Sequence, residues 1–123
     1  MVKPEVAKKV AEGVHKTKIT KIEERPITEK NKYHYFDVWV NVDGVDLKHG
    51  LPANITMDPT TDEPVSKLAK FLTDFGEKID KEKDYTEEVI NKLLVGKEVQ
   101  IMTENKQSDS GATFANIVSF KPA

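Results

Sequence analysis

The chain has 123 residues, of which 37% are hydrophobic and 33% are charged, and its formal net charge is −2. This length predicts one domain with a real core, and the absence of cysteine excludes a disulfide framework and a thiolate metal site. The apolar runs are short and the first residues lack a secretory signal, so we expect no membrane-spanning helix and a cytoplasmic location, which is the host cytoplasm if the protein is viral.

Charge is distributed unevenly along the chain. Residues 1–50 hold ten Lys or Arg against eight Asp or Glu, whereas residues 51–100 hold seven against eleven. Lysine outnumbers arginine eighteen to one, which suits contact with phosphate as a point charge better than bidentate reading of bases. The composition therefore gives modest electrostatic support for nucleic-acid binding.

The first strand is predicted to be long and irregular. It follows Gly13, which ends a short helical turn expected over residues 4–11. The apolar positions Val14, Ile19 and Ile22 change parity twice, which predicts a bend or bulge within the strand. A polar connection then leads to the second strand.

Residues 32–42, KYHYFDVWVNV, are predicted to form a second strand with aromatic side chains on both faces. The face assigned to the core carries His34, Phe36, Val38, Val40 and Val42. The opposite face carries Tyr33, Tyr35, Asp37, Trp39 and Asn41. Three of the chain's four Tyr and Trp residues thus lie away from the core, which indicates either a ligand that stacks there or another element that covers the face.

A tight turn and a third strand follow. Asp43-Gly44 is a strong hairpin signal, and residues 45–51 continue as the third strand. The chain then enters a loop over residues 52–63 that is rich in Pro, Thr and Asp.

Two helices are predicted next. Asp62 is expected to cap the first helix, which Gly76 ends. Its apolar stripe comprises Val65, Leu68, Ala69, Leu72 and Phe75. The sequence Asp84-Tyr85-Thr86-Glu87 resembles a capping box and is expected to begin the second helix, whose apolar residues are Val89, Ile90, Leu93 and Leu94.

Two strands complete the chain. The fourth is predicted over residues 98–103, with Val99 and Ile101 inward, and the fifth over residues 113–121 after a polar loop. In the fifth strand Phe114, Val118 and Phe120 share one parity and are assigned to the core.

The predicted element order is β-β-β-α(α)-β-β, which makes the protein mainly β. This is the layout of the five-stranded Greek-key barrel called the OB-fold, and it argues against a doubly wound parallel sheet, which needs repeated β-α alternation. We therefore expect residues 1–123 to form a single OB-fold domain, with a core barrel over residues 12–122 and an N-terminal extension over residues 1–11.

Six segments of the chain follow a pattern known from one group of OB-fold proteins. They are Gly13 to Lys16, Ile19 to Ile22, Tyr33 to Val42, Val65 to Gly76, Leu94 to Val99 and Phe114 to Ile117. On these segments the chain resembles the small OB-fold single-stranded-DNA-binding proteins of phages and archaea. The resemblance implies sequence-tolerant binding of single-stranded DNA in replication, recombination or repair.

In an OB-fold the ligand crosses the exposed face of the second and third strands, flanked by the loops that join the first strand to the second and the fourth to the fifth. The resemblance therefore implies stacking on three aromatic residues, Tyr33, Tyr35 and Trp39. It implies phosphate contacts from seven basic residues, which are Lys16, Lys18, Arg25, Lys30, Lys32, Lys48 and Lys106.

Alternatives to this interpretation stay open. The lysines of the first strand, Lys21 among them, are equally compatible with a solvated strand face, while Asp37 and Asp46 on the aromatic face are expected to repel phosphate. The same face could instead meet a partner protein or a second copy of the chain, which would make it a protein-interaction OB module. Single-stranded RNA binding is a variant of the first hypothesis.

No catalytic, metal or cofactor site is predicted. The three histidines, His15, His34 and His49, are not spaced like metal ligands, and residues 58–63 lack the glycine and terminal glutamate of an EF-hand loop. Nucleophile-elbow, phosphate-loop and zinc-protease motifs are missing, so we expect a binding protein and not an enzyme. The acidic segment 77–88 is expected to be solvated or to recruit a replication or recombination partner.

Overall fold

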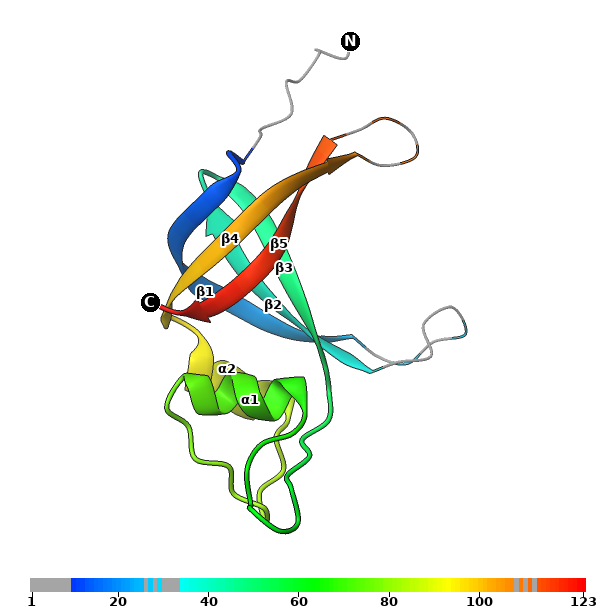
Figure 1. Cartoon of the computed structure of the whole chain (residues 1–123), viewed down its shortest axis with the longest axis vertical. Coiled ribbons are helices and arrows are strands. Elements are labelled where there is room, and N and C mark those ends of the chain that lie inside the picture. The colour runs from blue at the N-terminus through cyan, green and yellow to red at the C-terminus, as the bar shows by residue number, and fades with distance from the viewer. Residues whose placement is uncertain are drawn as a thin grey trace.

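The computed structural model of the chain describes residues 10–25, 27, 29, 34–107, 109, 111 and 113–123. Within these residues, five antiparallel strands curl into a nearly closed barrel, and two helices lie at one end of it (Figure 1). The elements are β1 (Gly13–Arg25), β2 (Tyr35–Val42), β3 (Val45–Pro52), α1 (Lys67–Asp74), α2 (Glu87–Leu94), β4 (Glu98–Gln107) and β5 (Thr113–Pro122). The expected element order and the mainly β class are confirmed. Neither helix is long and apolar enough to cross a membrane.

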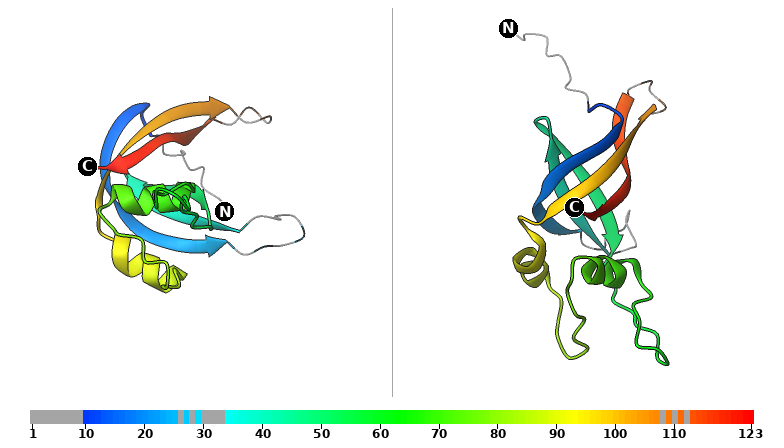
Figure 2. Two further views of the ribbon diagram at one scale, coloured as in Figure 1. Left: turned by 60° about the horizontal axis from the view of Figure 1, so that its bottom comes forward. Right: turned by 60° about the vertical axis from the view of Figure 1, so that its left-hand side comes forward.

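The sheet order is β3-β2-β1-β4-β5. The central strand β1 therefore joins the β2–β3 half of the sheet to the β4–β5 half. The first part of β1 pairs with β4 and the second part pairs with β2. The register shifts between Ile19 and Lys21, so the bulge expected from the parity of the apolar residues is confirmed. Figure 2 shows how the bent β1 lets the five strands wrap around one core.

Inward-facing side chains from all five strands and both helices meet in this core. Val99 and Ile101 are fully buried, as predicted for the fourth strand. The core also takes in Val10, which is only 3% exposed although it precedes β1. The Thr103 hydroxyl donates a hydrogen bond to the carbonyl of Ala11 at 3.0 Å, so the residues just before β1 pack as part of the barrel.

The hairpin between β2 and β3 turns at Asp43 and Gly44, as the sequence predicted. Asp43 and Gly44 have φ angles of 53° and 81°, the left-handed pair that a type I′ turn requires. The side-chain oxygen of Asn41 accepts a hydrogen bond from the Gly44 N–H at 3.1 Å, which holds the turn closed.

The start of α1 differs from the prediction. Its N-cap is Ser66, whose hydroxyl accepts a hydrogen bond from the Ala69 N–H at 3.3 Å. Asp62 does not cap the helix, because it lies in a loop with φ 60° and forms an ion pair with Lys81. An isolated antiparallel bridge joins Met57 to Pro64 across this loop.

The predicted apolar stripe of α1 is therefore shorter by one residue at its start. Val65 precedes the helix and is largely exposed, whereas Leu68, Ala69 and Leu72 are buried as expected. Gly76 follows the helix end with φ 85°, which is the conformation expected of a residue that stops a helix.

Helix α2 buries Ile90 and Leu94 in the core and also bonds to the edge of β1 through polar side chains. Its N-cap is Thr86, which accepts from the Val89 N–H at 3.3 Å, so the helix begins within the predicted signal. The Asn91 side chain accepts a hydrogen bond from the Ile22 N–H at 2.9 Å and donates one to the Ile22 carbonyl at 2.7 Å. A Glu87 carboxylate oxygen accepts from the Glu24 N–H at 3.0 Å. These contacts satisfy the edge of β1 beyond the point where β4 stops pairing with it.

The last two strands contain a second irregularity that the sequence analysis missed. β4 extends to Gln107, beyond the predicted end at residue 103. The register of β4 and β5 shifts between Met102 and Thr103, so that Ile117 and Phe120 both face inward. The assignment of Phe114 and Val118 to the core was therefore wrong, and these side chains are 49% and 43% exposed.

Candidate functional site

The outer side of β1, β2 and β3 carries the aromatic residues singled out in the sequence. Three neighbouring strands contribute to this surface, which we name the outer aromatic face. It consists of Lys21, Glu23 and Arg25 from β1, Tyr35, Asp37 and Trp39 from β2, and Asp46, Lys48 and Gly50 from β3. The strand register sets these residues side by side in rows across the sheet.

One row is centred on Trp39. The register places Lys21 opposite Trp39 on one side and Lys48 opposite it on the other. The Nζ atoms of Lys21 and Lys48 lie 5.0 and 5.7 Å from the centre of the indole ring. Both ammonium groups are therefore within cation–π range of Trp39. The Nε1 atom of Trp39 is buried and has no hydrogen-bond partner among the described residues.

A second row is centred on Tyr35. Arg25 lies opposite Tyr35 in the register, and its guanidinium carbon is 5.0 Å from the centre of the phenol ring. The Nε–H of Arg25 donates to Asp37 Oδ2 at 3.1 Å, and Nη2 donates to Asp37 Oδ1. These hydrogen bonds raise the pKa of Arg25 above its already high usual value, so the guanidinium is permanently charged.

Gly50 lies opposite Asp37 on β3 and leaves room for this arrangement. A Cβ atom at this position would stand 3.3 Å from Arg25 Nη2 and 3.5 Å from Asp37 Oδ1. Arg25 therefore crosses from β1 over Asp37 toward β3 at a point where the third strand has no side chain.

The outer aromatic face is balanced in charge. Three cations face three carboxylates, and four of these six groups are paired as Lys21 with Glu23, at 2.6 Å, and Arg25 with Asp37. The hydrogen bond to Glu23 raises the pKa of Lys21. Asp46 accepts a hydrogen bond from the Asn41 amide at 3.0 Å, while Lys48 forms no ion pair with any described residue. The repulsion expected from Asp37 is thus offset by its own arginine.

The structure brings together part of the predicted site. Tyr35, Trp39, Arg25 and Lys48 share the outer aromatic face. Three predicted residues, Tyr33, Lys30 and Lys32, lie outside the described residues.

Three further lysines that the sequence pointed to are placed elsewhere. Lys16 and Lys18 belong to the part of β1 that pairs with β4, where they lie opposite Gln100 and Glu98. Lys106 is near the far end of β4, opposite Phe114. None of these lysines lies in a row with Tyr35 or Trp39.

Sequence reasoning missed two contributions to the face. Lys21 was considered only with the other lysines of the first strand, although the bulge before it turns it toward Trp39. The parity change between Ile19 and Ile22 was the signal that could have found it. Gly50 carried no signal, because its role depends on Arg25, a residue 25 positions earlier in the chain.

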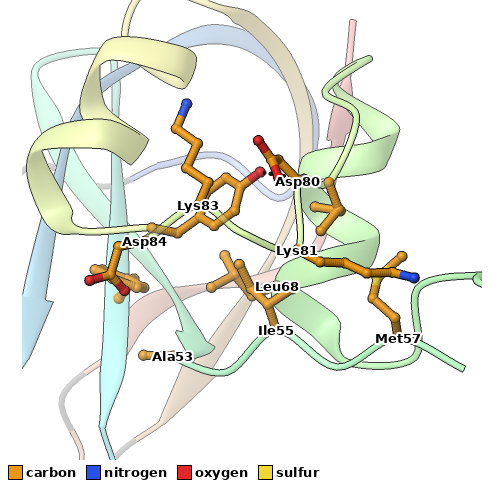
Figure 3. A pocket seen from close by; sticks show the side chains of 11 residues that line it. Ala53, Ile55, Met57, Leu68, Asp80, Lys81, Lys83 and Asp84 are labelled. Carbon is orange, nitrogen blue, oxygen red and sulfur yellow. Dashed lines mark hydrogen bonds between the residues drawn. The ribbon is translucent and has the colours of Figure 1, made fainter. Parts of the chain in front are cut away.

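A pocket of about 340 Å³ opens at the helical end of the barrel (Figure 3). Its apolar lining comprises Phe36, Ala53, Ile55, Met57, Leu68 and Ile79. Its polar lining comprises Asp80, Lys81, Lys83, Asp84 and Tyr85. The Tyr85 hydroxyl accepts a hydrogen bond from the Asp80 N–H at 3.0 Å, which ties the rim together.

No known protein family has a model that matches this chain, and no curated protein matches it in sequence. The outer aromatic face is therefore characterised by its own chemistry. It presents two aromatic rings, three cations and three carboxylates on adjacent strands.

Proposed function

We propose that the chain binds single-stranded DNA on the outer aromatic face and that its barrel is a Greek-key OB-fold. The element order and the sheet order support this fold assignment. One observation carries the functional proposal: each aromatic ring of the face has a basic side chain within 6 Å of it, Arg25 at Tyr35 and two lysines at Trp39. Rings beside cations are the elements with which proteins bind unpaired strands.

The proposed mechanism is stacking assisted by contacts to phosphate. Tyr35 and Trp39 are four residues apart on one strand face, which separates them by about 13 Å at about 3.3 Å per residue. Each stacked base contributes roughly 1–3 kcal/mol, and every base has a ring face, so binding of this kind is tolerant of sequence. A base that stacks on Trp39 displaces a lysine from the ring, and the displaced lysine is then free to contact the phosphate.

In a cell this activity fits an accessory role in replication, recombination or repair, in the cytoplasm of the organism or of a viral host. Single-stranded RNA would meet the same rings and cations, so it belongs in the same experiment.

A second candidate function is contact with another protein through the same face. The charge balance favours it, since four of the six charged groups are already paired within the face. Trp, Tyr and Arg are also the residues that dominate the energy of protein interfaces. The partner would be a second copy of the chain or a replication or recombination protein.

Trp39 is the single tryptophan of the chain, so its fluorescence reports directly on the face. Titration with oligo-dT, and with oligo-U in parallel, is expected to quench the emission, with an affinity that falls between about 50 and about 200 mM NaCl. Unchanged emission at saturating oligonucleotide and low salt would contradict the proposal. A dimer that resists salt and shields Trp39 from a soluble quencher would instead support the second candidate.

A further inference from the structure

The chain contains a single arginine among eighteen lysines, and this arginine is the most firmly held cation of the outer aromatic face. Arg25 is bound by two hydrogen bonds to Asp37, lies 5.0 Å from the centre of the Tyr35 ring, and extends toward Gly50. Residues from three strands therefore determine where its guanidinium group lies.

One edge of the Arg25 guanidinium has no hydrogen-bond partner among the residues that the structure describes. A guanidinium group has five N–H donors, and Asp37 takes two of them, one from Nε and one from Nη2. The remaining three, two on Nη1 and one on Nη2, make no hydrogen bond with any described residue. The side chain is 38% exposed, so part of it is accessible to a ligand.

The free edge has the shape of an anion-binding fork. Two parallel N–H groups match two oxygens of a phosphate, a geometry that the single ammonium of a lysine does not offer. We propose that Arg25 is a phosphate-binding residue held ready by Asp37, and that Asp37 is its positioning residue. This inference rests on the proposed function and specifies how the phosphate of a bound strand is recognised.

Asp37 strengthens the site in this proposal, in contrast to what its charge alone suggests. Asp37 as a whole residue is only 7% exposed, and both of its carboxylate oxygens accept hydrogen bonds from Arg25. A ligand therefore meets the guanidinium edge first, and the orientation of that edge is already settled before binding. Without Asp37, the guanidinium would be free to leave the ring of Tyr35.

Two acidic residues on the same face are expected to have opposite effects on binding. Asp37→Asn is expected to weaken oligo-dT binding about fivefold, because it releases the fork. Asp46→Asn removes the same charge from the neighbouring strand without touching Arg25, and it is expected to raise the affinity up to about twofold. Fluorescence titration of both variants, with thermal melts to verify folding, measures this contrast. Equal or tighter binding by Asp37→Asn would overturn the inference.

Three further variants test the fork itself. Arg25→Lys keeps the charge but loses the paired donors, so its affinity is expected to fall about fivefold. Asp37→Asn introduced into Arg25→Lys is expected to add little further loss, because Asp37 acts through the arginine. Full additivity of the two changes would show that Asp37 acts independently and would contradict its positioning role. Gly50→Ala, which crowds Nη2, is expected to weaken binding without loss of folding.

A spectroscopic readout follows the arginine directly. Because the chain has one arginine, its Nε–H gives a single identifiable signal in a nitrogen-15 NMR spectrum. The signal is expected to shift on addition of oligo-dT, and a shift with inorganic phosphate alone at the same phosphate concentration would identify free phosphate as the source. An unmoved Arg25 signal while Trp39 emission is quenched would overturn this inference and leave the proposed function standing. If neither signal responds to oligonucleotide or phosphate, both fail.

Discussion

Asp37 lies between Tyr35 and Trp39 on β2, and its sequence position alone suggests a charge that repels phosphate. The structure pairs it with Arg25, twelve residues earlier in the chain, so its charge is already compensated. The role assigned to Lys21 also changes, because the bulge in β1 brings this residue to the ring of Trp39. At this scale the identity of a residue's neighbour decides its role.

A pair of lysine substitutions tests which basic residues belong to the face. Lys48→Gln is expected to weaken oligo-dT binding several-fold, because Lys48 lies beside Trp39 and has no ion-pair partner among the described residues. Lys16→Gln makes the same charge change on the part of β1 that pairs with β4, and its affinity is expected to stay close to that of the wild type. A larger loss with Lys16→Gln, measured in the same fluorescence titration, would place the binding surface on the β1–β4 side.

At the scale of elements, patterns with a short period were predictable. The alternation of β2, the Asp43-Gly44 turn and the stripe of Leu68 and Leu72 all follow from residues a few positions apart. Irregular points were predictable only where they changed the apolar pattern itself. The bulge near Ile19 did so. The bulge near Val118 left the apolar residues of β5 in a regular period-two pattern, and this pattern led to the wrong assignment of Phe114 and Val118 to the core.

Helix α2 offers a test of how the elements are joined. Asn91→Ala leaves the N–H and the carbonyl of Ile22 without their partners, and the free energy of unfolding is expected to fall by about 1–3 kcal/mol. Lys92→Ala, in the same helix but in an exposed pair with Glu88, is expected to change it by less than about 0.5 kcal/mol. Urea denaturation compares the two variants, and similar losses would show that the Asn91 bonds are not what docks the helix.

At the scale of the whole molecule, no strand pairing among the described residues joins β3 to β5, and we call this junction the seam of the barrel. β3 and β5 are the two edges of the sheet, and they meet through side chains. The ring of His49 from β3 stacks on Phe120 from β5 with 5.2 Å between centres, and Phe71 from α1 lies 5.4 Å from Phe120. The neutral imidazole thus forms part of the apolar contact that closes the barrel.

This seam makes stability depend on pH. Burial lowers the pKa of His49 from 6.5, and the positive charge of Lys67 lowers it further, so folding favours the neutral ring. The resulting stabilisation is complete above the unfolded pKa of 6.5 and is lost as the pH falls from there toward the lowered folded pKa. Unfolding measured between about pH 7.5 and about pH 5.5 is expected to show decreasing stability. His49→Gln, which cannot titrate, is expected to show a smaller decrease, and an equal decrease would assign the effect to other groups.

The sequence by itself determined the class of the protein, the order of its elements, most of its core and the aromatic character of one strand face. These properties depend on residue types and short periods, which are local. The tertiary structure decided which residues stand beside that face: it placed Arg25 on Asp37 and Tyr35, set two lysines at Trp39, and left Lys16 and Lys18 with β4. Strand register joins residues that are distant in the chain, and a single bulge changes which of them meet. Patterns of neighbouring residues in the sequence do not predict which distant residues the strand register pairs.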